Sequence, residues 1–158
     1  MRRKDREITD RDSIIRILGE CKVMRLGMCL DNIPYVTPVN FGYEITEKGF
    51  VFYFHCAQEG KRLDIISQNP NVFIEIDNGG EITEAEKACG YSCDYKSVMA
   101  QGIARIITDS DEMKHALSML MRHQTGLDFT FEDNDLEGVT VCAVTASEIT
   151  AKARITKN

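Results

Sequence analysis

The chain has 158 residues, of which 43% are hydrophobic and 28% are charged, so we expect one packed domain over residues 1–158 and not a disordered chain. The formal net charge of −6 argues against a nucleic-acid-binding surface, and no apolar run reaches the roughly 18 residues that a membrane-spanning helix needs. The N-terminal stretch leads into no apolar signal segment, so we expect a cytoplasmic protein without a membrane partner.

The predicted elements begin with a helix, whose apolar residues recur at helical spacing up to Gly19. Residues 23–30 predict a first strand and residues 33–43 a second. Because proline cannot donate to a strand ladder, Pro38 belongs at a sheet edge or bulge, and Gly42 indicates the close approach of another group. The strand around Pro38 could offer free backbone groups to a flat heterocycle, or the proline could simply end the pairing at a barrel rim.

Residues 51–75 predict a strand, a turn, a helix, a turn and a strand, and Pro70 helps to stop that helix. The helix begins at Gly60, where unpaired backbone N–H groups and the positive end of the helix dipole favour an anion. Lys61 and Arg62 oppose that dipole, so a bound anionic group such as a phosphate would explain them. The alternative is that both cations only cover a solvated helix face.

The rest of the chain alternates between strand-like and helical patterns. The predicted elements are a turn over 46–49, a strand over 72–77, a loop or mobile lid over 78–93, a strand over 95–108 with a bulge at Gly102, a helix from 109–111 to Gly126, and a last strand over 139–149. About six strands with helices at the front, in the middle and near the end indicate a mainly β protein, a small barrel with peripheral helices.

Six cysteines occur without a CxxC pair, so we expect reduced and mostly buried thiols. Cys89 and Cys93 could in principle hold a metal or form a redox pair, but no second ligand pair with zinc-like spacing is present, so no metal site is expected. His115 and His123 are eight residues apart, too distant for the i, i+4 pair that a metal prefers, and we expect both at the surface.

Four motifs occur in a fixed order: IPYVTPVNFGY over 33–43, FHCAQEGKR over 54–62, Asn69-Pro70, and YKSVMAQG over 95–102. Together they resemble the flavin-binding split barrels related to pyridoxamine 5′-phosphate oxidase. The opening residues 1–8 and the histidine at position 55 resemble the nitroimidazole-resistance branch of that superfamily. The resemblance extends over nearly the whole chain.

This resemblance implies a six-stranded antiparallel split β-barrel that forms a homodimer with FMN at the subunit interface. The residues that it implies for the cofactor are Gly60, Lys61 and Arg62 at the phosphate, Pro38, Val39 and Asn40 beside the isoalloxazine ring, and Ser97 reaching the flavin with Tyr95 and Val98 beside it.

A flavin supplies hydride and one-electron chemistry. The resemblance therefore implies an FMN-dependent oxidoreductase that passes electrons from an external donor to a small oxidised acceptor such as a nitroaromatic. His55 would be its catalytic residue and would donate a proton or polarise the acceptor, or it would only hydrogen-bond the flavin or cap the helix at Gly60. The alternative function is a flavin- or haem-binding module without turnover of its own, and FAD or haem could take the place of FMN.

Two departures from the family bear on the activity. The pyridoxamine 5′-phosphate oxidases carry a basic strand motif where this chain has Pro38 and Tyr43, and residues 151–158 do not match their arginine-containing substrate motif. An oxidase acting on vitamin B6 is therefore a weaker interpretation. Ala151 replaces a glycine that is usual in the nitroimidazole branch, which weakens the transfer of a role to Lys152.

Overall fold

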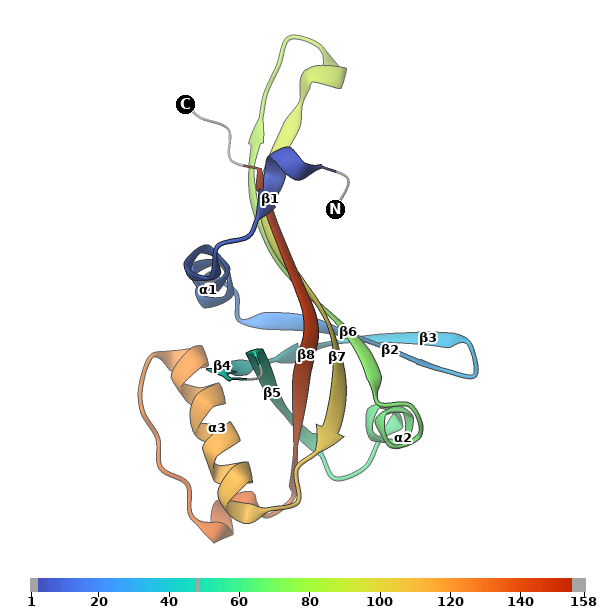
Figure 1. Ribbon diagram of the computed structural model, residues 1–158, viewed down its shortest axis with the longest axis vertical. Coiled ribbons are helices and arrows are strands. Elements are labelled where there is room, and N and C mark those ends of the chain that lie inside the picture. Colours follow the sequence, from blue (N-terminus) through green and yellow to red (C-terminus); the bar gives the residue numbers. More distant parts are fainter. Residues whose placement is uncertain (1–2, 48, 155–158) are drawn as a thin grey trace.

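The computed structural model describes residues 3–47 and 49–154 (Figure 1). Parts of three sequence predictions lie outside the described residues. They are Met1 and Arg2 of the opening motif, Lys48 of the predicted turn, and residues 155–158 of the C-terminal departure.

The described chain forms helices and strands in alternation. In chain order they are η1 (Lys4–Arg6), β1 (Glu7–Ile8), α1 (Arg11–Glu20), β2 (Val23–Leu30), β3 (Ile33–Asn40), β4 (Gly42–Thr46), β5 (Gly49–Ala57), α2 (Lys61–Gln68), β6 (Asn71–Thr83), η2 (Ala88–Gly90), β7 (Ser92–Ile106), α3 (Ser110–Thr125), η3 (Asp133–Leu136) and β8 (Val139–Arg154). Of the helices that the structure describes, none is both long enough and apolar enough to cross a membrane.

All strands join one sheet of eight strands, in the order β3-β2-β6-β7-β8-β5-β4, with β1 paired to β8. Every ladder is antiparallel, and β3 and β4 lie at the two ends of the order, so the sheet is open between them. This confirms a mainly β fold with peripheral helices, as expected of a split barrel. The predicted count of six strands is too low for the described chain, because residues 33–43 form two strands and the short β1 has no readable pattern.

The break between β3 and β4 follows from the close approach of helix α3. A Cβ atom at Gly42 would lie 2.4 Å from the Cα and backbone N atoms of Leu120, so only glycine fits there. This confirms the prediction that Gly42 marks a close approach. Pro38 lies on the end strand β3, which confirms its edge position, and the pairing with β2 continues past it to Asn40.

The larger core fills one face of the sheet and is closed by two helices. Helix α1 contributes Ile14, Ile17 and Leu18, and helix α2 contributes Leu63, Ile65 and Ile66. A smaller cluster lies between α3 and the other face of β5. Strand β5 is therefore buried on both faces, which accounts for its continuous apolar run.

The predicted loop or lid over 78–93 is wrong in its extent. Strand β6 continues to Thr83 and β7 already begins at Ser92, and the two strands pair again beyond a register shift between Gly79 and Ile82. Figure 1 shows the resulting hairpin projecting from the end of the sheet at the top of the view. Its polar, glycine-bearing sequence hides the strands because the hairpin has no buried face to impose alternation. The predicted bulge at Gly102 is confirmed by the shift in the pairing of β7 with β8.

Candidate functional site

The N-terminus of α2 leaves backbone donors free at the edge of the sheet. Gly60 is its N-cap, with a φ of 142° that only glycine adopts easily, and no described side chain caps the helix. The amides of Leu63 and Asp64 donate to the carbonyl of Gly60 at 2.9 and 3.2 Å. No hydrogen bond within the described chain takes up the amides of Lys61 and Arg62, so both remain available to an anion.

Arg62 is held in place by two contacts, and no acidic residue among those described pairs with it. Its Nη2 donates to Thr37 Oγ1 at 3.0 Å, and its guanidinium lies 5.7 Å from the centre of the Phe54 ring. Its Nε is buried without a hydrogen-bond partner among the residues that the structure describes. A buried, unpaired guanidinium N–H is costly, so this geometry favours a bound anion over the solvated-face interpretation.

Lys61 lies beside Arg62 in a more exposed position. Its ammonium rests 4.7 Å from the centre of the Tyr35 ring, at the distance of a cation–π contact. Within the described ranges it makes no ion pair with a carboxylate. The two predicted phosphate-binding cations are neighbours, each lies against an aromatic ring, and neither pairs with a carboxylate of the described chain.

Strand β3 presents different residues to the start of α2 than the sequence predicted. Thr37 contacts Arg62 and Tyr35 contacts Lys61, whereas Val39 is buried in the core and can offer only backbone atoms. The alternation along the strand separates these residues from Pro38, which is exposed on the other face. Side chains alternate between the two faces of a strand, so counting back in steps of two from Val39 could have identified Thr37 and Tyr35 as residues on the same face.

The amide of Asn40 is already engaged elsewhere. Its Nδ2 donates to the carbonyl of Lys22 and to Gln124 Oε1, each at 3.1 Å. Asn40 therefore ties the end of β3 to helix α3, and a ligand contact through its Nδ2 would have to replace one of these bonds.

A second group of predicted residues lies on β7. Ser97 is only 5% exposed, and its Oγ is buried without a partner among the described residues. It lines a cavity of about 260 Å³ with Met99, Thr150 and Lys152. Its neighbour Val98 points the other way into the core, so its side chain cannot reach a ligand in that cavity.

Tyr95 extends this second group toward the N-terminal segment. Arg6 Nη1 donates to the Tyr95 hydroxyl at 3.2 Å, and the ammonium of Lys152 lies 5.5 Å from the ring centre. The ring is thus flanked by two cations, in keeping with a surface that accepts an electron-rich or anionic group.

The two groups lie on opposite faces of the sheet, because Arg62 contacts Thr37 on the core side, whereas Ser97 shares the face of Gln101. The amide of Ala104 donates to the carbonyl of Pro70 just after α2, and Ser97 lies seven positions further up β7. At about 3.3 Å per residue, roughly 20 Å of strand separates the two points.

His55 lies at the exposed end of β5, and no described residue hydrogen-bonds its ring. Strand alternation directs it to the face of Tyr53, opposite to the face of Phe54 on which Arg62 packs. His55 and Phe54 are both close to the end of β5 at Ala57. A ligand that contacts His55 on one face and Arg62 on the other therefore has to pass around that end of the strand. His55 does not cap α2, because no described side chain makes a capping hydrogen bond at the N-terminus of this helix.

The other two histidines differ in their surroundings. His115 is exposed, as predicted, and its Nε2 lies 3.0 Å from Glu44 Oε2. The prediction of a surface position is wrong for His123, which is half-buried and packs 4.5 Å from the centre of the Phe41 ring. Its Nε2 donates to the carbonyl of Cys21 at 2.8 Å, and burial lowers its pKa. Helix position alone could not show this, because the covering residues come from distant strands.

Cys89 and Cys93 are exposed free thiols, whereas Cys21 and Cys142 are buried. Within residues 3–47 and 49–154, no group of three or more His, Cys, Asp or Glu residues is placed to hold a metal.

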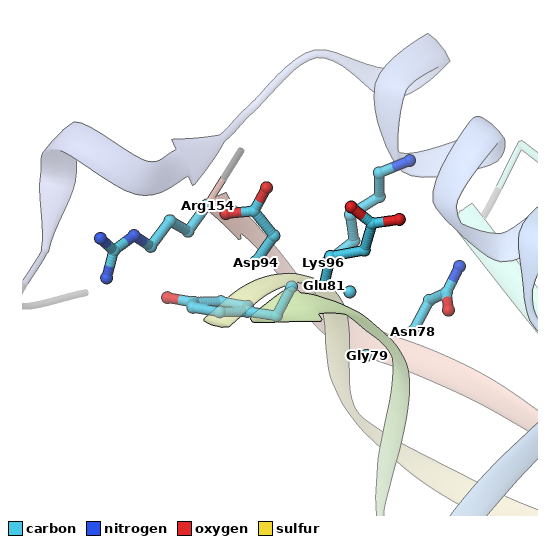
Figure 2. A pocket seen from close by; sticks show the side chains of 8 residues that line it. Asn78, Gly79, Glu81, Asp94, Lys96 and Arg154 are labelled. Carbon is cyan, nitrogen blue, oxygen red and sulfur yellow. The ribbon is translucent and has the colours of Figure 1, made fainter. Parts of the chain in front are cut away.

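A separate cavity of about 300 Å³ lies at the base of the β6–β7 hairpin (Figure 2). Figure 2 shows the Asp94 and Glu81 carboxylates between Arg154 on one side and Lys96 on the other. Lys96 is already paired with Glu20 at 2.7 Å. This mixed charge does not favour an anion, and the cavity shares only Tyr95 with the predicted site.

Three solved structures show what this chain is similar to. A Bacteroides thetaiotaomicron VPI-5482 protein assigned to 5-nitroimidazole antibiotic resistance is 32% identical, with a TM-score of 0.79 over 93% of this chain and 86% of that one. The flavocytochrome Anf3 from Azotobacter vinelandii has a TM-score of 0.81 at 19% identity, over 99% of this chain and 72% of that one. A FAD- and haem-binding protein from Mycobacterium smegmatis has a TM-score of 0.80 at 15% identity, over 96% and 74%. The last two likenesses show the fold alone.

No curated protein sequence matches the chain. The family model described as pyridoxamine 5′-phosphate oxidase matches residues 10–153, which is nearly the whole chain. Together with the Bacteroides relative, this match confirms the resemblance carried by the four motifs: the chain belongs to the pyridoxamine 5′-phosphate oxidase family.

Proposed function

We propose that this protein is an FMN-dependent oxidoreductase that works as a homodimer and reduces a small oxidised acceptor such as a nitroaromatic. The observation that carries the proposal is the buried Nε of Arg62, which has no partner in the described chain. The sequence resemblance implies that Arg62 binds the cofactor phosphate, and an unpartnered donor supports that role. The 32% identity to a protein assigned to 5-nitroimidazole resistance supports the choice of acceptor.

The phosphate end of the cofactor would be held by one chain. Arg62 Nε and the free amides of Lys61 and Arg62 supply donors, and the two side chains supply positive charge. Thr37 accepts a hydrogen bond from Arg62 Nη2, so the arginine is already oriented before a ligand binds. Such preorganisation lowers the entropy lost on binding.

The sheet face opposite the core is a candidate interface for a second copy of the chain, which would supply the rest of the cofactor site. One row across four strands contains Val36, Gly27, Phe73 and Gln101, which pair with one another in register. Val36 is 61% exposed, and Phe73 and Ile103 are each 48% exposed. Apolar side chains gathered on one sheet face indicate an interface.

Ser97 lies on this same face, further along β7. A second chain that packed across this face and reached past the edge strand β3 would bring its Ser97 and Tyr95 toward the first chain's Arg62, which lies on the other side of β3. The buried Ser97 Oγ, unpartnered in the described chain, would then gain a polar atom of the cofactor as its partner.

The flavin, when bound, supplies hydride and one-electron transfer, and the chain supplies position and protons. His55 is the candidate proton donor, because its imidazole is exposed and no described residue engages it. Lys152 and Arg6 around the Tyr95 ring would favour an acceptor that gains negative charge on reduction. The electrons come from an external donor.

Stopped-flow reoxidation tests the function. The protein is reduced anaerobically and then mixed with a 5-nitroimidazole or with oxygen-saturated buffer. We expect the nitroimidazole to speed the reoxidation in proportion to its concentration, and His55→Gln to slow that step more than it slows the reaction with oxygen. If the acceptor never speeds reoxidation, the protein is a flavin-binding module without this turnover. A Soret band in the purified protein would instead identify a haem module.

A further inference from the structure

Two cysteines that the proposed function does not use lie beside Arg62. In the antiparallel pairing of β5 with β8, Phe54 is opposite Cys142 and Cys56 is opposite Thr140. Cys56 follows Phe54 by two positions, so it shares the face on which Phe54 and Cys142 lie. The two thiols are therefore diagonal neighbours on adjacent strands.

Arg62 completes this cluster from helix α2. Its guanidinium packs on Phe54 and is anchored by Thr37, which brings its charge to the face that carries Cys56. Its Nε remains without a partner in the part of the chain that the structure describes. A cation next to a half-buried thiol stabilises the thiolate, which is the nucleophilic form.

The two thiols differ in their tendency to ionise. Cys142 is fully buried, and its contact with Cys56 together with burial raises its pKa. The pKa of Cys56 is lowered by the neighbouring Cys142 and by the Arg62 guanidinium, against the opposing effect of burial. Cys142 from β8 and Arg62 from α2 are the titratable groups that act on Cys56, and Thr37 from β3 is neutral. Cys56 is thus the thiol that ionises first, with Cys142 kept protonated beside it.

We propose that Cys56 is a modification site, a thiolate held by Arg62 that hydroperoxides oxidise to a sulfenic acid. The sulfur attacks one peroxide oxygen, the O–O bond breaks and an S–O bond forms. The sulfur loses two electrons to the peroxide, and the leaving oxygen takes a proton from water and departs as water or an alcohol. The site depends on Arg62 but not on a bound flavin.

The first test follows alkylation of Cys56 by iodoacetamide across pH, read on its peptide by mass spectrometry in the full-length protein without added cofactor. We expect a midpoint well below the value of about 8.5 of an ordinary thiol. Arg62→Gln should raise the midpoint by about one pH unit, and Arg62→Lys should keep it low. Lys61→Gln is the matched control, because it removes a charge from the same helical turn but from the side of Tyr35.

The second test treats the protein with hydrogen peroxide and traps sulfenic acid with dimedone. We expect the adduct on Cys56 in the wild type and in Lys61→Gln, and at least severalfold less of it in Arg62→Gln. An ordinary midpoint for Cys56, an equal shift in Lys61→Gln, or no adduct on Cys56 would each overturn the proposal. FMN titration of the same samples is independent: a reactive Cys56 without FMN binding would sink the proposed function alone, and FMN binding with an inert Cys56 would sink this inference alone.

Discussion

Replacing Arg62 by glutamine should weaken FMN binding much more than replacing Lys61 by glutamine. A charge-assisted hydrogen bond is worth about 1.5–3 kcal/mol. Arg62 is half-buried and fixed by Thr37, and its Nε is unpartnered within the described chain, so we place its loss at about 2–3 kcal/mol. At about 1.4 kcal/mol per tenfold, that is a rise in Kd of roughly 30- to 140-fold.

Lys61 should contribute less, because its ammonium is exposed to solvent and already rests on Tyr35. Solvent screening limits such a charge to about 1 kcal/mol, or roughly a fivefold rise in Kd. Substituting both residues should cost at least a hundredfold.

The assay is titration of apoprotein with FMN, followed by the quenching of flavin fluorescence. Riboflavin, which lacks the phosphate, serves as the ligand control, and its affinity should not change in either variant. Arg122→Gln, which removes an exposed arginine paired with Asp128, serves as the protein control. A Kd for Arg62→Gln within threefold of wild type, or an equal loss of riboflavin affinity, would refute the assignment of Arg62 to the phosphate.

Further predictions concern stability. Gly42→Ala should destabilise the fold by about 3 kcal/mol or more in chemical denaturation, because its Cβ would meet the backbone of Leu120 at 2.4 Å. Gly19→Ala, where a Cβ meets nothing within 4 Å, should stabilise helix α1 by up to about 1 kcal/mol, and a loss of stability there would contradict the account of glycine packing. Because burial lowers the pKa of His123, the unfolded chain takes up a proton that the folded one does not, so the free energy of unfolding should fall as pH drops below about 6.5. His123→Gln should make the free energy of unfolding less dependent on pH in that range. An unchanged dependence would show that folding does not oppose the protonation of His123.

The fold was largely accessible from the sequence because most strands have a buried face. The alternation in β2 and the apolar runs of β5 reflect their packing directly, and Asp109 and Gly126 mark the ends of α3 as capping chemistry requires. The β6–β7 hairpin escaped prediction because it projects from the sheet, where pairing and not burial holds the strands.

The candidate site was only partly accessible. The position of Gly60, Lys61 and Arg62 at the start of α2 could be predicted, because apolar residues at helical spacing follow them. Their role toward an anion stays a prediction. The contacts of Arg62 with Thr37 and of Asn40 with Gln124 join segments far apart in the chain, and no local pattern encodes them. The position of Ser97 is likewise hidden from local patterns, because only the strand register shows that it shares the face of Gln101.

Native mass spectrometry of the purified protein, followed by the mass of any cofactor released on denaturation, tests the central claim most directly. The account predicts a dimer that carries FMN in equal number to its chains, and a dimer of Arg62→Gln that has largely lost it. A monomer without flavin that also fails to take up added FMN would contradict the claim that the chain forms a dimer in which the start of α2 holds a flavin phosphate.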